Sequence, residues 1–300
     1  MPTPYLRAVV GVKEQYADGV ERSTAAVRLH APGIEVDVDP VHGGRVAGLR
    51  VDGWDLLVRR GRTAIDWGCY LMVPWAGRLR EARLDWRGGT WQLPRSLPPH
   101  AIHGTLFDVP WTLVGGQDGA ATCELAADLT EPWPFGGRAG QRISIGPDGL
   151  RLEVRVEAAD HAMPVIVGWH PWFVRRLVPL SGRPEPGAVE LALEARAMLA
   201  ADPPAIPSGA RVPVPPGPWD DTFVDVAGPP VVRWPGALEL SLYAPEAIAW
   251  VVFTRRDEGI CVEPQTGAPN GLNGGPLGVP PVLEPGQALE ASFELRWRES

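Results

Sequence analysis

The segment Arg151-Leu-Glu-Val-Arg-Val-Glu157 alternates charged and apolar residues without a break. Side chains of a β-strand point to opposite faces at every second residue, so Leu152, Val154 and Val156 would share one face. The charged residues would share the other face. The segment therefore predicts a strand that is buried on one side and exposed to solvent on the other.

The same alternation recurs along the chain, at residues 33–39, 189–194, 237–242 and 289–297. Residues 248–253 form a continuous apolar run, which suits a strand buried on both faces. Turn-forming pairs such as Pro32-Gly33 and Asp148-Gly149 separate the runs, and no amphipathic helical pattern is sustained. Hairpins at roughly regular spacing predict an all-β fold, a large antiparallel β-sandwich.

The chain of 300 residues contains 35 glycines and 34 prolines, and apolar runs separate their clusters. We interpret this composition as many turns rather than low complexity. The proline-rich segment 202–218 is the best candidate for a linker, but the strands on its two sides look alike. We therefore expect one domain over residues 1–300, with 202–218 as a long loop that feeds a site.

The formal net charge is −8 and the basic clusters are short, which argues against nucleic acid or an anionic membrane surface as partner. The three cysteines are far apart, as expected of reduced thiols in a cytoplasmic protein. Residues 1–7 lack the apolar run of a secretory signal, and no stretch of about 18 apolar residues could span a membrane. We expect a cytoplasmic monomer or homodimer.

The apolar stretch Ile260–Val262 delivers a single carboxylate, Glu263, and a turn rich in proline, glycine and asparagine follows at once. This layout is typical of a strand that ends by presenting an acid at the rim of a pocket. A solvated strand end is the alternative interpretation.

Two of the six histidines stand in unusual surroundings. His103 precedes a glycine, which leaves room beside the imidazole, and His170 lies within Gly168-Trp-His-Pro-Trp-Phe173. An imidazole among aromatic residues can act as a general acid, because its surroundings set its pKa. The alternative for both is a histidine of the core. His100 and His103 have a spacing compatible with zinc, but no cysteine lies nearby, so we do not expect a metal site there.

Further polar and aromatic residues suit a sugar. Arg78 could donate a forked set of hydrogen bonds to hydroxyls, and Asp220 or Asp221 could accept them. An indole ring suits the apolar C–H face of a sugar, although most of the 13 tryptophans must serve the core. The tryptophans in segments that resemble loops or strand ends are Trp67, Trp75, Trp133, Trp169, Trp172 and Trp219.

Together these segments resemble the aldose 1-epimerase (mutarotase) family, galactose mutarotase-like in fold. The matching pieces occur in the family's order over roughly residues 30–297: Arg78, His103-Gly104, His170-Pro-Trp-Phe173, Asp220 to Phe223, Glu263, and Leu283-Glu-Pro-Gly286. The resemblance implies a β-supersandwich with its site on a concave sheet face. The chain departs from the family at Gly77 and Val174, where asparagine is frequent.

The resemblance also implies roles. Glu263 would be the general base and His170 the general acid, while His103, Arg78 and Asp220 would hold hydroxyls and the ring oxygen of a small-molecule sugar. No metal and no cofactor would be needed. The implied reaction interconverts the α and β anomers of a free hexose.

Three alternatives remain at this point. A hexose-6-phosphate 1-epimerase would need basic residues at the pocket mouth, for which Arg45, Arg80 and Arg142 are candidates. A glycoside hydrolase would use Glu263 with an aspartate. A catalytically silent sugar-binding protein could have the same fold.

Overall fold

The computed structural model describes residues 26–147, 149–203 and 205–300. Residues 1–7, on which the expectation about a secretory signal rests, lie outside these ranges. Helical structure in the described part is confined to two 3₁₀ turns, η1 (Arg80–Ala82) and η2 (Gly271–Asn273). None of the helical segments described is long and apolar enough to cross a membrane.

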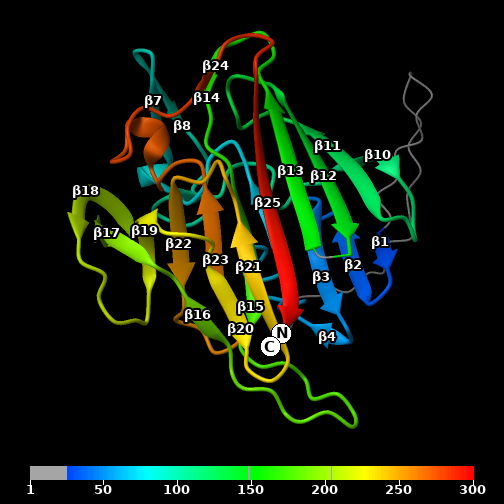
Figure 1. Ribbon diagram of the computed structural model, residues 1–300. Helices are drawn as coiled ribbons and strands as arrows, with labels where there is room; N and C mark the ends of the chain where they lie inside the picture. The colour runs from blue at the N-terminus through cyan, green and yellow to red at the C-terminus, as the bar shows by residue number, and fades with distance from the viewer. Residues whose placement is uncertain (1–25, 148, 204) are drawn as a thin grey trace, which may run out of the picture.

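Two large antiparallel sheets make up most of the fold (Figure 1). In spatial order, the 11-stranded sheet runs β1 (Val27–Ala31), β2 (Ile34–Asp39), β3 (Arg45–Val51), β5 (Cys69–Met72), β15 (Gly168–Val174), β23 (Gly259–Gln265), β22 (Ala249–Phe253), β19 (Asp220–Val226), β17 (Ala195–Asp202) and β18 (Ile206–Val212), with β4 (Trp54–Asp55) beside β3. The eight-stranded sheet runs β10 (Thr112–Gly116), β11 (Thr122–Asp128), β12 (Arg138–Gly146), β13 (Gly149–Glu157), β25 (Ala288–Glu299), β21 (Leu238–Tyr243), β20 (Val231–Trp234) and β16 (Glu190–Ala192).

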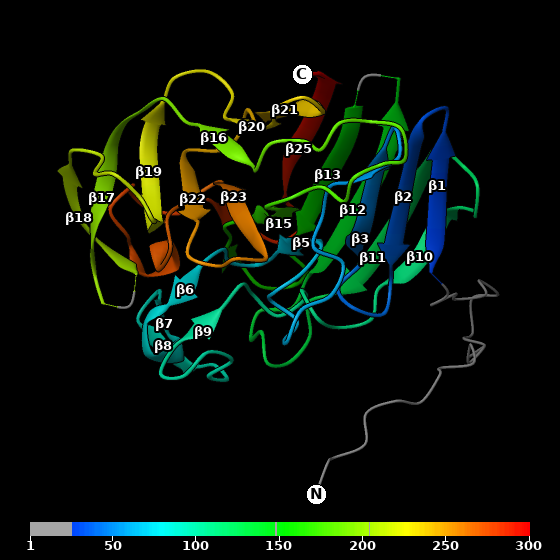
Figure 2. The ribbon, with the colours of Figure 1, turned by 90° about the horizontal axis from the view of Figure 1, so that it is seen from below.

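The main core lies between these sheets. Trp169 of β15 approaches Phe293 of β25 with ring centroids 5.9 Å apart, and Phe173 approaches Trp234 of β20. Viewed from below, the large sheet extends past the eight-stranded sheet on the side of β17 to β19 (Figure 2). The central strands of the large sheet are buried on both faces, because loops cover the face that points away from the core.

Three two-stranded ribbons complete the fold: β6 (Arg78–Leu79) with β9 (Ala101–Ile102), β7 (Arg83–Trp86) with β8 (Gly89–Gln92), and β14 (Met163–Pro164) with β24 (Val282–Leu283). The β6–β9 ribbon bears on the predicted site, because Arg78 begins β6 and His103 follows β9 directly. Val73 also forms an isolated parallel bridge with Gly104, which ties the chain beyond β9 back to the end of β5.

The predicted fold class is confirmed, and the alternating segment that predicted it lies in β13, where Leu152, Val154 and Val156 are buried. The prediction of a loop over 202–218 is wrong for residues 206–212, which form β18. This strand lies at the edge of its sheet, the position where a strand tolerates proline because one row of its backbone N–H groups has no ladder partner. The end of β17 and the turn before β18 do reach the pocket described below, through Ala201 and Ala205 respectively.

Candidate active site

The pairing of strands β5, β15, β23 and β22 places His170 and Glu263 side by side in one row across the large sheet. His170 is paired with Tyr70 of β5, and Glu263 is paired with Val251 of β22. The β15–β23 register pairs Gly168 with Gln265 and Trp172 with Cys261, which places His170 directly opposite Glu263. Side chains opposite each other in adjacent strands share a face, with Cβ atoms about 5 Å apart. Residues distant in sequence therefore meet because of pairing alone.

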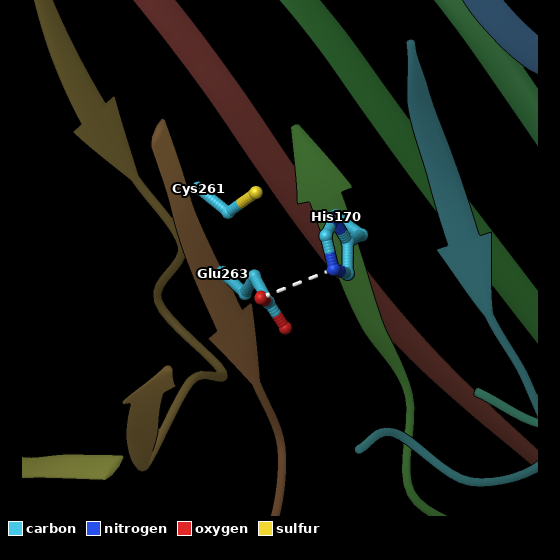
Figure 3. Close-up of side chains that lie close together, drawn as sticks. All are labelled: His170, Cys261 and Glu263. Atoms are coloured by element: carbon cyan, nitrogen blue, oxygen red, sulfur yellow. Dashed lines mark ion pairs between the residues drawn. The ribbon is translucent and has the colours of Figure 1, made fainter. Parts of the chain in front are cut away.

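His170 and Glu263 are in contact at the centre of this row (Figure 3). The Nε2 atom of His170 lies 3.2 Å from Oε1 of Glu263, and both side chains are buried. Gln265, two residues further along β23, donates from Nε2 to the other carboxylate oxygen at 3.2 Å. An imidazole and a carboxyl group at this distance can pass a proton between them.

Aromatic rings fix the plane of the His170 imidazole. Tyr70 stacks on it with centroids 4.7 Å apart and planes at 16°, and Trp172 lies on it at 5.7 Å and 28°. The tyrosine hydroxyl and the indole N–H both donate to the carbonyl of Ile65, so neither ring is free to turn. His170 is therefore held in an orientation that directs Nε2 at Glu263.

Arg78 and Asp220 lie at the same pocket and are paired with each other. A guanidinium nitrogen of Arg78 lies 3.3 Å from Oδ2 of Asp220, and both side chains are largely buried. The Nε atom of Arg78 is buried without a hydrogen-bond partner in the described part of the chain. The pair therefore keeps donor and acceptor capacity for a polar ligand.

Asn270, in the turn after β23, does not line the pocket. It holds the backbone of Arg78 and Arg80 in place. The backbone N–H of Asn270 donates to the carbonyl of Arg78, and its side chain accepts from the N–H of Arg80. Gly77 precedes Arg78 with φ +69°, and a Cβ atom there would lie 2.6 Å from Pro269. The close approach of this turn explains why glycine, and not the asparagine frequent in the resembled family, stands at position 77.

His103 faces His170 from the ribbon side, with ring centroids 4.9 Å apart and planes at 80°. Its own φ is +61°, a conformation that non-glycine residues rarely adopt outside sites that require it. Its N–H donates to the carbonyl of Gly77. Gly104 is required by the backbone, because a Cβ there would lie 1.9 Å from the carbonyl oxygen of Val73. Room beside the imidazole, the reason predicted for this glycine, is not the decisive one.

All five predicted site residues line one pocket of about 830 Å³, its open mouth included: Glu263, His170, His103, Arg78 and Asp220. Asp221 also lines it, with a carboxylate oxygen that accepts from the N–H of Asp220. Sequence reasoning missed Asp66 and Arg256, which line the wall and are joined by a 2.6 Å ion pair. No motif marks them, because only the fold brings residues 66 and 256 together.

Burial controls protonation on the pocket floor. It raises the pKa of the Glu263 carboxyl well above its usual value, with the charge of Asp220 adding to the shift. It lowers the pKa of His170 to about 3, with the positive charge of Arg45 acting in the same direction. Burial also lowers the pKa of His103, and His170 adds to this effect. Both shifts favour the neutral forms of the pair, with the proton on the Glu263 carboxyl rather than on the His170 imidazole.

One expectation needs correction. Glu263 is not at a rim: it lies inside β23, which continues to Gln265 because Gln265 still pairs with Ala249 of β22. Of the two histidines considered for zinc, His100 accepts through Nδ1 from the backbone N–H of Glu81. Among the residues with described positions, His170, Cys261 and Glu263 lie near enough to one another to hold a metal ion.

The tryptophans serve packing more than sugar contact. Of the six singled out, only Trp172 lines the pocket, and its ring contacts His170 and Arg256. Trp75 packs against Trp133, Trp169 against Phe293 and Trp219 against Phe223, while Trp67 covers the guanidinium of Arg45. Large aromatic rings are needed here to fill the space between and around two wide sheets.

The arginines considered for a phosphate are all engaged elsewhere. Arg45 is fully buried and donates to four backbone carbonyls, those of His42, Ala64, Trp67 and Phe107. Arg80 is paired with Asp202, and Arg142, on the other sheet, with Glu124.

Comparison with known proteins bears on the family and the fold of this chain. The sequence model of the family described as aldose 1-epimerase matches residues 27–222. A galactose mutarotase-like protein from Clostridium acetobutylicum is similar in structure, with a TM-score of 0.78 at 16% identity, covering 97% of this chain and 99% of that one. The galactose 1-epimerase from Lactobacillus acidophilus NCFM gives 0.73 at 15%, covering 97% and 98%. At such identities the likeness shows the fold.

A curated relative, the uncharacterized protein YphB of Escherichia coli K12, is 26% identical over 145 residues. The match covers 47% of this chain and about half the length of the relative (49%).

Proposed function

Because this chain belongs to the aldose 1-epimerase family, we propose that it interconverts the α and β anomers of a free hexose by acid–base ring opening and reclosure. The observation that carries the proposal is the contact of His170 with Glu263, two opposed proton-transfer groups on the floor of a pocket that Arg78 and Asp220 also line. Anomer exchange needs a base at the C1 hydroxyl and an acid at the ring oxygen.

The reaction begins with a shift of the shared proton. Burial favours the protonated carboxyl of Glu263 in the resting pocket, whereas the reaction needs a carboxylate base and an imidazolium acid. Transfer from Oε1 to Nε2 across the 3.2 Å contact supplies both and leaves the net charge of the pair unchanged. The positive charge of Arg78 stabilises the carboxylate form of Glu263 but disfavours the imidazolium form of His170, so Arg78 acts on the two ends of the transfer in opposite senses.

Glu263 then takes the proton of the C1 hydroxyl while His170 protonates the ring oxygen. The bond between C1 and the ring oxygen breaks, and C1 becomes an aldehyde carbon. After rotation about the C1–C2 bond, the hydroxyl attacks the opposite carbonyl face, with the two residues in exchanged roles. His103, Arg78 and Asp220 hold the remaining hydroxyls. Nδ1 of His103 and Nε of Arg78 are buried polar atoms without a hydrogen-bond partner among the described residues. The Arg78–Asp220 pair can share its polar atoms with a hydroxyl.

A neutral sugar suits the pocket better than a sugar phosphate. Both arginines that line the pocket are already paired with carboxylates, Arg78 with Asp220 and Arg256 with Asp66. A phosphate dianion would have to displace a carboxylate from one of these pairs and leave it close to the negative charge of the ligand. The proposed substrate is therefore uncharged.

The test is saturation-transfer NMR of anomer exchange over a panel of free aldoses and hexose 6-phosphates. We expect enzyme-dependent exchange for at least one free hexose, and slower exchange for its 6-phosphate. Binding without exchange across the panel would support a catalytically silent sugar-binding protein. Faster exchange of the 6-phosphate would support a hexose-6-phosphate 1-epimerase and overturn the proposal.

A further inference from the structure

A third reactive side chain lies beside the His170–Glu263 pair and has no part in the proposed reaction. Cys261 is two residues before Glu263 on β23, so both side chains are on the same sheet face. The sulfur of Cys261, an imidazole nitrogen of His170 and a carboxylate oxygen of Glu263 all lie within 4.8 Å of one another. Figure 3 shows the sulfur pointing from β23 toward the His170 ring.

These three donors match the preferences of one class of ion. Sulfur, imidazole nitrogen and carboxylate oxygen are the ligands of Zn²⁺, and three protein ligands with one open position are typical of reactive zinc sites. Bond lengths of about 2.0–2.3 Å in a tetrahedral site put the donors about 3.3–3.8 Å apart. The His170–Glu263 separation of 3.2 Å is already close to this range, and the sulfur lies within 4.8 Å of both atoms.

Charge also favours the ion. Cys261 is completely buried beside Glu263. A divalent cation that binds one thiolate and one carboxylate forms a neutral unit, so burial no longer opposes their ionisation. Both groups would release their protons to solvent through the pocket on binding.

We propose that His170, Cys261 and Glu263 form a site for a thiophilic divalent cation, Zn²⁺ or Cd²⁺, and that the ion switches off proton transfer by occupying both reactive side chains. The ion would enter between His170 and Glu263, which line the pocket, and would take the sulfur of Cys261 from beneath. Its open coordination position would face the sugar pocket. Sugar and metal therefore compete for the same side chains.

The experiment uses the full chain, stripped with a chelator and titrated with Co²⁺ as a spectroscopic probe, followed by Zn²⁺ in calorimetry. We expect a thiolate-to-cobalt charge-transfer band that Zn²⁺ abolishes. Cys261→Ala should lose the band and bind Zn²⁺ at least ~10-fold more weakly, since a lost ligand costs no less than a lost supporting contact. Cys123→Ala is the matched control, because Cys123 is equally buried but lies in the other large sheet.

Wild-type Zn²⁺ affinity in Cys261→Ala, or a cobalt spectrum without the thiolate band in the unaltered chain, would overturn the site. Cys261→Ser provides a second variant of similar volume if the alanine variant does not fold, and near-UV circular dichroism checks both. The metal readouts do not depend on catalysis. Loss of mutarotation on Zn²⁺ addition rests on the proposed function, so a chain that binds metal but shows no exchange activity would contradict that function alone.

Discussion

Nε2 of His170 and Oε1 of Glu263 lie 3.2 Å apart across the β15–β23 pair, with burial acting on the two groups in opposite senses. Burial favours the protonated carboxyl and the neutral imidazole, although the proposed reaction needs the reverse distribution. The pair behaves as one unit with one proton, and this has consequences for activity and for stability.

If the two residues act as a unit, removing either should cost about as much as removing both. We expect Glu263→Gln and His170→Asn each to lower kcat for anomer exchange by ~10²–10⁴-fold. The double variant should lose little more than the more damaging single variant, because neither group works without the other. NMR exchange rates at saturating sugar measure all three. A loss in the double variant equal to the product of the single losses would show that the groups act independently.

The stability of the fold should depend on pH through the same pair. His170 binds a proton below pH 6.5 when unfolded, but only near pH 3 when folded, so its contribution to stability falls as the pH drops through this range. Glu263 acts oppositely: its folded pKa lies above the ordinary value of 4.5, so folded protein binds more protons above pH 4.5 and stability falls as the pH rises. The two effects oppose each other between pH 4.5 and 6.5.

Glu263→Gln removes one of these opposed effects. Above pH 4.5 the unfolding free energy of the variant, minus that of the unaltered chain, should rise with pH by up to about 1.4 kcal/mol per unit. Urea unfolding followed by tryptophan fluorescence, at intervals between pH 4 and 8, measures this difference. A constant difference over the range would mean that Glu263 is ionised in the folded protein. Asp221→Asn provides a control carboxylate in the same pocket.

How much the sequence reveals depends on how local the signal is. The strand at 151–157 was predictable because one face is buried and the other solvated, which leaves period two in the residues. In β15 both faces are buried, Trp169 against the other sheet and His170 in the pocket, so no alternation marks the strand. His170 stood out there through its aromatic neighbours and through the resemblance to a family, not through a strand pattern.

The geometry of the site lay beyond sequence reasoning for a related reason. Glu263 meets His170 through the register of strands 93 residues apart, and a register is a property of the whole sheet. The ion pair of Asp66 with Arg256 joins residues separated by 190 positions and carries no motif. The edge strand β18 was hidden by its own Pro207 and by the prolines around it, which suggest a loop unless the strand is known to lie at an edge.

We expect Arg78 to contribute to sugar binding through the shape of its guanidinium group and not through its charge alone. Arg78→Lys keeps the charge but loses the fork that can serve both Asp220 and a hydroxyl. We expect KM for the sugar to rise about 10- to 100-fold, the loss of one or two charge-assisted hydrogen bonds. Arg80→Lys, in an exposed ion pair with Asp202, is the control and should change KM by less than about 3-fold. Equal effects of the two substitutions on KM would show that Arg78 does not bind the sugar.

Gly104 offers a direct test of how the backbone holds His103. Gly104 and Gly236 have nearly the same φ, +81° and +80°, but a Cβ at 104 would lie 1.9 Å from the Val73 carbonyl oxygen, whereas one at 236 meets nothing within 4 Å. Gly236→Ala should therefore cost only the conformational penalty of about 1–2 kcal/mol in unfolding free energy. Gly104→Ala should cost more than about 3 kcal/mol, because the chain after β9 must move away from the end of β5. Urea unfolding measures both, and equal losses would show that conformation alone, not the close approach to Val73, requires glycine beside His103.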